Sequence, residues 1–364
     1  MVERLTLPDG SEVWHVSGYA TVRAALADPR LSLDKAHAKA WTGFALPPAL
    51  DANLLNMDPP DHTRIRSLVS QAFTPRRVEQ LRPFVQRVAD ELLDAVAGDG
   101  RADLIAAYAG PLPVIVIGEL LGVPADAGAR FRELTSTLLN PPSREAAAGA
   151  ITGIQRFITD LIRRRRTDPG GDLLSAMIAA RDADDRLTED ELTSLAFLIL
   201  IAGHETTVNL IGNAVHLLLT HPDRLAEARC EPESLPAVVE EVLRVAPPTP
   251  VAFRRFPVED VELDGVRIPA GDTVLLSIAG ANRDPARFDR PEVFDPARTD
   301  GGHVALGHGI HYCIGAPLAR LEGEIALRTL LRRLPRLALA VPEAQLRWSP
   351  SFRTRGLLEL PVAY

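Results

Sequence analysis

Apolar side chains recur along most of this chain at helical spacing, and proline, glycine and acidic residues separate the periodic stretches. This pattern predicts helices over residues 18–27, 78–97, 110–121, 127–139, 144–166, 172–180, 188–220 and 316–334. Shorter runs predict a hairpin over residues 5–7 and 13–16, and strands at 251–256, 261–263, 266–268, 273–277 and within the tail, 336–364. The chain is therefore expected to be mainly α with small β-sheets.

Residues 33–57 show no clear period, and they predict a long loop of the kind that often carries function. A helix is expected to open directly after this loop, with Asp58 as its N-cap and prolines in its first turn. His62 and Arg66 stand one turn apart on the same face of that helix. Such a pair is either a solvated basic face or a site for an anion.

The helix predicted over residues 188–220 is the longest, at roughly 45–50 Å, and Thr188 and Glu191 form a capping box at its start. Residues 202–207 (AGHETT) interrupt its apolar sequence near the middle. Glycine and threonine lower helical propensity there, and a threonine hydroxyl can bond back to a carbonyl and open the turn. Polar residues at the centre of a buried helix indicate a functional site, and a satisfied buried Glu205 is the structural alternative.

The chain has two cysteines, Cys230 and Cys313, which are too far apart for a disulfide framework and point to a reducing cytosol. Cys313 lies in residues 306–315 (LGHGIHYCIG), where three glycines let the backbone approach a flat partner closely. The helix predicted to follow favours the thiolate through its dipole. A thiolate in such a loop suits an axial ligand of iron, and a buried cysteine in a tight turn is the alternative.

Composition excludes several classes of protein. The formal net charge is −8, which does not suggest a general role with nucleic acid or an anionic membrane surface. The first residues carry charges and form no signal peptide, and the most apolar run, residues 195–202, is too short for a transmembrane helix. No repeat and no long linker divides the chain, so residues 1–364 are expected to form one domain.

The stretch around Cys313 resembles the haem-binding loop of the cytochromes P-450, whose pattern is Phe-x-x-Gly-x-x-x-Cys-x-Gly. Gly309, Cys313 and Gly315 match this pattern, and His311 is the usual bacterial residue two positions before the cysteine. Leu306 stands where the family usually has phenylalanine, which weakens one packing contact against the loop without touching the ligand.

Further motifs follow the family's order over nearly the whole chain. Residues 202–206 match its acid–alcohol motif, Ala-Gly-x-Asp/Glu-Thr. Glu241 and Arg244 match its Glu-x-x-Arg pair, which Arg298 completes as a triad. The prolines at 141–142 resemble the break between the two helices that cover the family's substrate channel.

The resemblance implies a cytochrome P-450 fold, with haem b between the long central helix and the helix after the cysteine loop. It implies that Cys313 binds the iron and that His62, Arg66 and Arg255 bind haem propionates. The full set of implied cofactor contacts is His62, Arg66, Ala202, Gly203, Arg255, Gly309, His311, Cys313 and Gly315. Glu205 and Thr206 are the implied catalytic pair: Glu205 relays protons from solvent, and Thr206 donates a hydrogen bond and holds a water.

The activity so implied is a haem-thiolate monooxygenase that inserts one atom of O2 into a C–H or C=C bond of a small apolar substrate. Polyketides, terpenoids and similar secondary metabolites fit this description. No flavin or nucleotide-binding segment is visible, so electrons are expected from NAD(P)H through a separate ferredoxin and its reductase. The protein is expected to be a cytoplasmic monomer.

Two other functions stay open for this sequence. A peroxide-driven peroxygenase would have the same fold, but such relatives replace the acid–alcohol pair that is intact here. A non-enzymatic haem-thiolate sensor would not need Glu205 and Thr206. Substrate-dependent consumption of NAD(P)H with a ferredoxin system separates the three.

Three further expectations concern surfaces and ends. The substrate walls are predicted to come from residues 33–57, 125–150 and 249–253, including Trp41, Phe44, Leu46, Leu138, Leu139 and Val251. A basic patch for an acidic ferredoxin is predicted from Arg64, Arg76, Arg77, Arg328, Arg332 and Arg333. Relatives usually have a first helix before the hairpin, so its apparent loss here suggests a misassigned start codon; the alternative is that the protein does without it.

Overall fold

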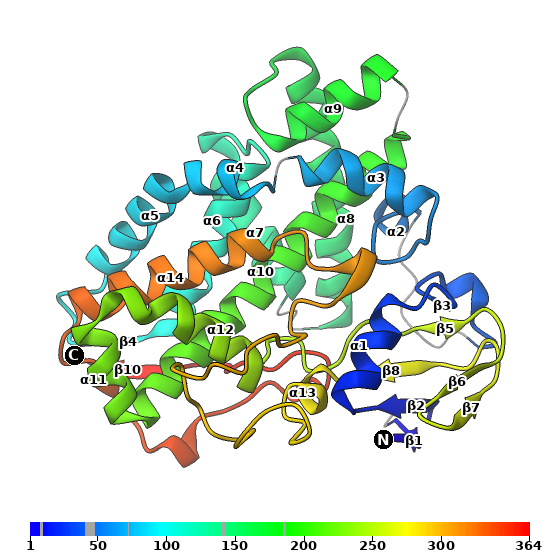
Figure 1. The fold of residues 1–364 in the computed structure, drawn as a ribbon. Coiled ribbons are helices and arrows are strands. Elements are labelled where there is room, and N and C mark those ends of the chain that lie inside the picture. The colour runs from blue at the N-terminus through cyan, green and yellow to red at the C-terminus, as the bar shows by residue number, and fades with distance from the viewer. Residues whose placement is uncertain (8–9, 41–47, 72, 140–142, 185–186) are drawn as a thin grey trace.

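The long helix α10 (Glu189–Thr220) runs through the middle of the computed structural model, and the other elements are arranged around it (Figure 1). The structure describes all residues except 8–9, 41–47, 72, 140–142 and 185–186. α10 packs against α2 (Pro48–Asp51), α6 (Pro111–Leu120), α12 (Leu235–Val245) and α14 (Ala316–Arg333). It therefore forms the central element of the fold, as its apolar sequence predicts.

The remaining helices complete a mainly helical body. They are α1 (Tyr19–Ala27), α3 (Asp61–Ser70), α4 (Pro75–Gln80), α5 (Arg82–Asp94), α7 (Gly128–Leu139), α8 (Arg144–Thr167), α9 (Leu173–Asp184), α11 (Pro222–Cys230) and α13 (Ile278–Ala281). A single π-helical turn, Ile105–Ala109, leads into α6. The prediction of a mainly α fold is confirmed.

The strands form four small sheets. Their bounds are β1 (Val2–Thr6), β2 (Glu12–Val16), β3 (Leu31–Ser32), β4 (Arg101–Asp103), β5 (Phe256–Pro257), β6 (Val261–Leu263), β7 (Val266–Ile268), β8 (Val274–Leu276), β9 (Ala338–Leu339) and β10 (Pro361–Ala363). The sheet orders are β1-β2-β8, β4-β10-β9, β3-β5 and β6-β7. The hairpin pairs Val2 with Val16, and β2 then runs parallel to β8. The predicted strands at 261–263 and 266–268 are found unchanged.

Two hydrophobic clusters stabilise these parts. The larger one surrounds α10 and joins the helices. The smaller one lies between α1 and the β1-β2-β8 sheet, at the lower right of Figure 1, and contains Val16, Val22, Leu26 and Val274. The loop that precedes α14 contributes Val304 to the smaller cluster, so α1 supports this loop from below.

Several predicted boundaries are wrong for identifiable reasons. The helix predicted over 78–97 is two helices, α4 and α5, because Pro83 opens the second one in its first turn, where a missing N–H costs nothing. The tail forms the short strands β9 and β10, as its alternation predicts. The sequence pattern also missed β4, which pairs with β10 at the far end of the chain.

The predicted cap of α3 is also wrong. α3 begins at Asp61, and no side chain caps it. The carboxylate of Asp58 instead accepts hydrogen bonds from the Ser32 hydroxyl and from Leu33 N. The preceding segment, expected to be a plain loop, contains a 3₁₀ turn at Lys35–His37 and the short helix α2. Asp58 thus ties the start of α3 to β3.

The centre of α10 carries polar residues but keeps regular helical geometry. The capping box of Thr188 and Glu191 forms as predicted. Thr206 Oγ1 donates to Ala202 O at 2.6 Å and Thr207 Oγ1 to Gly203 O at 2.9 Å, yet the helix is unbroken there. By length and composition α10 could cross a membrane, contrary to the sequence-based expectation. However, 67% of its most apolar window is buried inside the protein, which is typical of a core helix.

The predicted Glu-x-x-Arg triad is confirmed as a buried ion cluster. Arg244 and Glu241 form two hydrogen bonds of 2.8 Å, and both side chains are almost fully buried. Arg298 Nε donates to the same carboxylate at 3.0 Å. Arg244 also donates to the carbonyls of Pro291 and Val293. The triad therefore fastens residues 291–298 to α12.

Candidate active site

A large apolar cavity lies between α10 and the loop that carries Cys313. Cys313, Ile314 and Gly315 line one side, and Ala202, Gly203, Thr206 and Thr207 of α10 line the other. Aliphatic and aromatic side chains make up most of the remaining wall: Leu33, Leu54, Leu55, Val69, Phe73, Ile117, Leu120, Leu195, Leu198, Ile199, Leu243, Ala252 and Phe253. The cysteine motif and the α10 motif, 107 residues apart as 313 minus 206, therefore meet across one space.

The cysteine is held at the start of α14 with its side chain accessible from the cavity. Cys313 N donates to Leu306 O at 2.8 Å, which closes the loop on itself. Burial raises the pKa of the Cys313 thiol, while backbone N–H groups of Gly315 and Ala316 and the charge of Arg66 act in the opposite direction. The N–H groups at the helix start thus favour the thiolate as expected, although burial has the larger effect on the pKa of Cys313.

Glycines make the loop possible at two points. Gly307 and Gly309 have φ angles of +78° and +73°, which side chains of L-residues rarely allow. Gly315 is different, because its φ is −81°. A Cβ atom there would lie 3.9 Å from Cys313 Sγ, beside the face that the sulfur presents. Gly307 and Gly309 therefore shape the turn, whereas at Gly315 an added Cβ would make only an ordinary contact with the sulfur.

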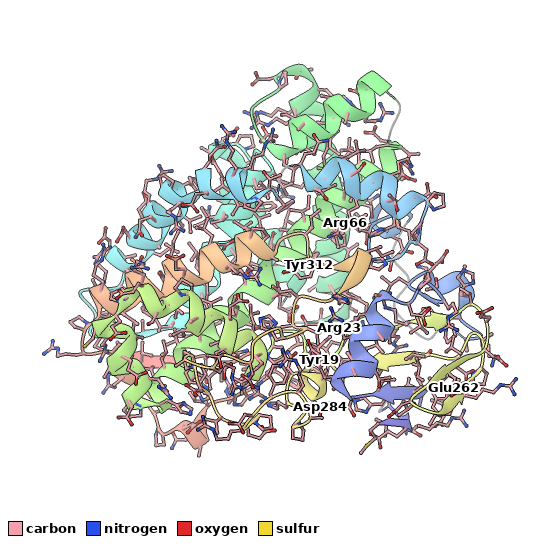
Figure 2. All side chains as sticks on the ribbon, viewed as in Figure 1. Tyr19, Arg23, Arg66, Glu262, Asp284 and Tyr312 are labelled. Atoms are coloured by element: carbon pink, nitrogen blue, oxygen red, sulfur yellow. The ribbon has the colours of Figure 1, made fainter. Side chains whose placement is uncertain are left out.

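Four basic or imidazole side chains gather near the cysteine loop. His62 and His311 stack with ring centroids 4.2 Å apart. Arg66 lies on the same face of α3 as His62 and donates to Tyr312 O. Arg66 and Tyr312 are neighbours in Figure 2. Arg255 lines the cavity with Arg66 and donates to Leu31 O at 3.2 Å. The sequence-predicted residues from three distant segments are thus brought together.

This group has hydrogen-bonding capacity that the protein does not use. Both ring nitrogens of His62, Nε2 of His311 and Nε of Arg255 are buried and have no partner among the described residues. Burial, reinforced by the neighbouring positive charges, lowers the pKa of His311 to about 3, and burial likewise lowers the pKa of Arg255 to about 10. Buried donors without partners are costly. The chemistry of the group fits a ligand that carries carboxylates, as the propionates of haem do.

The α10 motif is only partly in the cavity. Ala202, Gly203 and Thr206 line it, as predicted. A Cβ atom on Gly203 would lie 3.0 Å from Ile117, so this glycine also allows close packing of α10 on α6. Glu205 is half-buried and does not line the cavity, and it forms no hydrogen bond or ion pair with any residue that the structure describes. Thr206, rather than Glu205, therefore faces the cysteine.

The predicted substrate walls are confirmed in part. Leu33, Leu54 and Leu55 from residues 33–57 line the cavity, as do Thr249, Ala252 and Phe253 from residues 249–253. Leu138 and Val251 do not line the cavity. Trp41, Phe44 and Leu46 lie outside the described residues, as does the side chain of Leu139. No described residue of 125–150 lines the cavity. Further apolar wall comes from the first half of α10 and the end of α3, two segments whose helical patterns look like ordinary core.

One titratable cavity residue was missed by the sequence analysis. Glu322 lies on α14, is fully buried and lines the cavity, and its Oε2 has no partner among the described residues. Burial raises the pKa of Glu322 to about 8, so the side chain is mainly neutral at pH 7. The available signal was a glutamate between the buried Leu321 and Ile325 of an otherwise apolar face.

The predicted basic patch is mostly neutralised. Arg64 pairs with Asp61 and Glu191, near the start of α10. The arginines of α14 are paired as well, Arg328 with Glu324 and both Arg332 and Arg333 with Asp90. Arg76 and Arg77 are exposed and form no ion pair within the part of the chain that the structure describes. The expectation of a six-arginine patch is therefore wrong, because acidic residues of α5, α10 and α14 face most of its members.

Comparison with known proteins places the chain in a family. The model of the cytochrome P450 family matches residues 137–339. The chain is 50% identical to the cytochrome P450 monooxygenase PikC of Streptomyces venezuelae over 99% of this chain and 87% of the relative. It is 46% identical to the 6-deoxyerythronolide B hydroxylase of Saccharopolyspora erythraea over 97% and 90% of the two chains. The chain therefore belongs to the cytochrome P450 family, as the motifs predict.

Solved structures agree with this assignment. The ligand-free P450 monooxygenase TamI superposes with a TM-score of 0.92 at 46% identity, covering 100% of this chain and 88% of that one. Its tirandamycin C-bound form gives a TM-score of 0.92 at 44% identity, covering 100% and 94%. The fold is the cytochrome P450 fold, the cofactor is haem b, and the protein is an oxidoreductase that incorporates one oxygen atom of O2.

Proposed function

We propose that Cys313 is the iron ligand of this monooxygenase and that the cavity between Cys313 and Thr206 holds both the haem and an apolar substrate. The observation that carries the proposal is the pairing of an accessible cysteine with unpartnered buried donors at the edge of one apolar cavity. Bound haem supplies the oxidising chemistry, with a thiolate ligand that favours cleavage of the O–O bond. The protein supplies orientation, protons and exclusion of water.

The residues divide this work by position. His62, Arg66, Arg255 and His311 would hold the propionates, which would use the unpartnered donors of His62, His311 and Arg255. Gly315, beside Cys313 Sγ, would add no bulk on the sulfur side of a bound haem, and Gly309 shapes the loop. Ala202 and Gly203 would add little bulk on the α10 side of the cavity. This arrangement leaves the apolar wall free to bind and orient the substrate.

Thr206 and Glu205 are the residues proposed to deliver protons to the cavity. The Thr206 hydroxyl lines the cavity and donates to Ala202 O, so its lone pairs are available to a water. Glu205, one residue earlier and half-buried, is placed to exchange protons with solvent. Transfer from Glu205 to Thr206 then needs a water between them, because Glu205 itself does not line the cavity.

The substrate is proposed to be a bulky apolar secondary metabolite such as a polyketide or terpenoid. The cavity wall is aliphatic and aromatic. Its charged groups are Arg66 and Arg255 near the cysteine loop, and the mainly neutral Glu322 lies on α14. Relatives carry names such as mycinamicin IV hydroxylase/epoxidase and polyketide biosynthesis cytochrome P450 PksS. A spectral screen for compounds that convert the haem from low to high spin identifies the substrate. A screen in which only charged compounds give the shift contradicts the proposed class.

The electron donor is proposed to be a ferredoxin, supplied by an NAD(P)H-dependent reductase, in the cytoplasm and with a monomeric oxygenase. Arg76 and Arg77 on α4 are the exposed arginines available to steer an acidic partner to the cysteine side. Turnover is expected to fall as ionic strength rises, because exposed charges are screened. The fall should be smaller in Arg76→Gln and Arg77→Gln. Salt-insensitive reduction of the wild type contradicts docking by charge.

The peroxygenase and sensor alternatives are tested together with this function. A ferredoxin system should give substrate-dependent consumption of NAD(P)H with formation of an oxygenated product. Turnover with hydrogen peroxide alone, and none with NAD(P)H, identifies a peroxygenase. Ligand-dependent spectra without product under either condition identify a sensor.

A further inference from the structure

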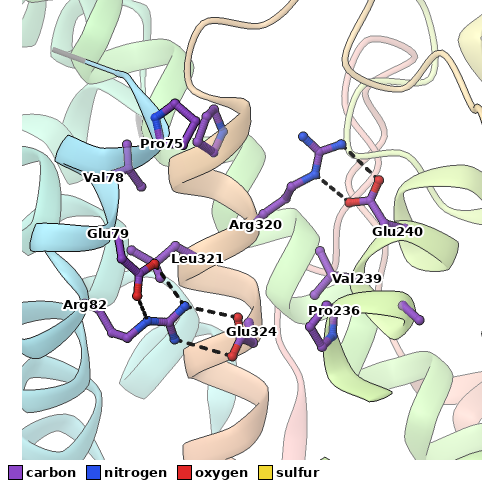
Figure 3. Close-up of a pocket in the computed structure, with 12 residues that line it drawn as sticks. Pro75, Val78, Glu79, Arg82, Pro236, Val239, Glu240, Arg320, Leu321 and Glu324 are labelled. Atoms are coloured by element: carbon purple, nitrogen blue, oxygen red, sulfur yellow. Dashed lines mark hydrogen bonds and ion pairs between the residues drawn. The ribbon is translucent and has the colours of Figure 1, made fainter. Parts of the chain in front are cut away.

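A surface groove lies between α4, α12, α14 and the start of α5 (Figure 3). Glu240 of α12 stands on its edge. Arg320 of α14 donates to both oxygens of Glu240, through Nε at 2.6 Å and through Nη2 at 2.9 Å. A second partner, His303, approaches the same carboxylate, with Nε2 3.2 Å from Oε2. Glu240 is therefore shared by two partners that are 17 residues apart as 320 minus 303.

The two partners stand before and after the cysteine loop. His303 Nδ1 accepts a hydrogen bond from Ala305 N at 3.2 Å, so its hydrogen lies on Nε2 and is donated to Glu240. Arg320 Nη1 donates to the hydroxyl of Tyr312, the residue next to Cys313, at 3.3 Å. One carboxylate thus connects the start of the loop to the residue beside its cysteine.

The neighbouring glutamate does a different job. Glu241 points into the protein, where it binds Arg244 and Arg298. Consecutive helical residues face about 100° apart, so Glu240 faces the groove while Glu241 faces the core. Burial alone would raise the pKa of Glu240, but the hydrogen bonds from His303 and Arg320 lower it to about 2. The carboxylate is therefore charged at any pH at which the protein is used.

We propose that Glu240 is a positioning residue for the cysteine loop, acting through His303 at one end and through Arg320 and Tyr312 at the other. It does not line the cavity that is assigned to the haem. Its role toward iron rests on the proposed ligation by Cys313. An ordinary surface ion pair contributes little, and both Glu240 and Arg320 are partly exposed. This pair differs because Arg320 donates to both oxygens of Glu240. The pair is also connected to the loop, through His303 on Glu240 and through Tyr312 on Arg320.

The test compares Glu240→Ala and Glu240→Gln with Glu324→Gln as the matched control. Glu324 lies in the same groove and also pairs with two arginines, Arg82 and Arg328, but it forms no bond to the loop among the residues that the structure describes. Two readouts on the haem-loaded protein are used: hydrogen exchange in residues 303–313, and the rate at which the reduced carbon monoxide complex loses its thiolate-type band. Glu240→Ala should raise both about three- to tenfold, Glu240→Gln less, and Glu324→Gln neither.

Two further variants test the contacts of His303 and of Tyr312 separately. They also keep the proposal testable if Glu240→Ala does not fold. His303→Ala should raise exchange mainly at the start of the loop, and Tyr312→Phe mainly beside Cys313. Equal behaviour of the Glu240 variants and Glu324→Gln in both readouts overturns the proposal. A wild type without the thiolate-type band overturns the ligation by Cys313 instead, and the exchange data then still decide whether Glu240 orders the loop.

Discussion

Gly309 and Ala27 are in contact through their backbones. A Cβ atom on Gly309 would lie 2.9 Å from both Cα and Cβ of Ala27 at the end of α1, and 3.3 Å from Leu26 O. The loop before Cys313 therefore rests directly on α1, with no room for a side chain between them. This contact and the hydrogen bond from Cys313 N to Leu306 O together fix the position of Cys313 in the cavity wall.

The first prediction compares two glycines with similar backbone angles. Gly309→Ala meets both a positive φ of +73° and the contact with Ala27, whereas Gly265→Ala meets a φ of +76° and open space. The strain of a positive φ costs about 1–2 kcal/mol in either variant. Gly309→Ala should lose clearly more stability and release haem faster, as measured by thermal unfolding and by transfer of haem to an acceptor protein. Equal losses in the two variants contradict the contact.

The second prediction concerns the iron ligand. The reduced wild-type protein with carbon monoxide should absorb near the position that gives the family its name. Cys313→Ser should lose that band and the activity, because a serine hydroxyl does not supply a thiolate. The control is Cys230→Ser at the end of α11, which should keep both, since Cys230 is exposed and does not line the cavity. An unchanged spectrum in Cys313→Ser sinks the assignment.

The third prediction concerns coupling at Thr206. Thr206→Ala removes the cavity hydroxyl but no contact assigned to the haem propionates or to the iron. Haem content, spin shift and NAD(P)H consumption should stay largely intact, while product falls and hydrogen peroxide appears in its place. Thr207→Ala removes the neighbouring back-bonded hydroxyl and should remain better coupled. Full coupling in Thr206→Ala means that the substrate supplies its own hydroxyl or that Thr206 has another role.

The fourth prediction concerns proton supply. Glu205→Gln keeps the size of the side chain but removes its ability to release a proton. The whole catalytic cycle should slow, by about 10²–10⁴-fold if the step becomes limiting, because proton-transfer groups contribute factors of that size. The measurement is the rate of NAD(P)H consumption with saturating ferredoxin. An unaltered rate with unaltered coupling means that protons reach Thr206 by another route.

The sequence was most informative where a residue's own chemistry dictates its surroundings. The capping box of Thr188 and the pair Glu241 and Arg244 were both placed correctly, because a cap and a buried ion pair each need specific partners nearby. The long apolar run likewise located α10, because a helix that is buried on most sides must be apolar on most sides.

The sequence failed where the deciding partner lies far along the chain. Asp58 looks like a helix cap, but Ser32 and Leu33, 26 and 25 residues away, take up its carboxylate. Arg332 and Arg333 look like a basic patch, but Asp90 of α5 lies beside them. A local sequence pattern carries no information about pairings between residues so far apart in the chain. It also cannot distinguish the leucines of α10 that line the cavity from those that fill the core.

The last prediction uses Glu322, the buried carboxyl group of the cavity wall. Its folded-state pKa of about 8 lies above the ordinary value of 4.5. Below pH 4.5 the group is protonated in both folded and unfolded protein, so its contribution to stability is fully present there. As the pH rises from 4.5 through 8, the unfolded chain releases the proton while the folded protein keeps it, and stability falls by at most about 5 kcal/mol. Glu322→Gln stays neutral throughout and should remove this fall. Unfolding by urea at pH 5.5 and pH 8 measures the difference, and Glu324→Gln, two residues further along α14, serves as the control with wild-type pH dependence. If Glu322→Gln shows the same loss between the two pH values as the wild type, Glu322 is ionised in the folded protein, and a water or a bound group then stabilises its charge in the cavity.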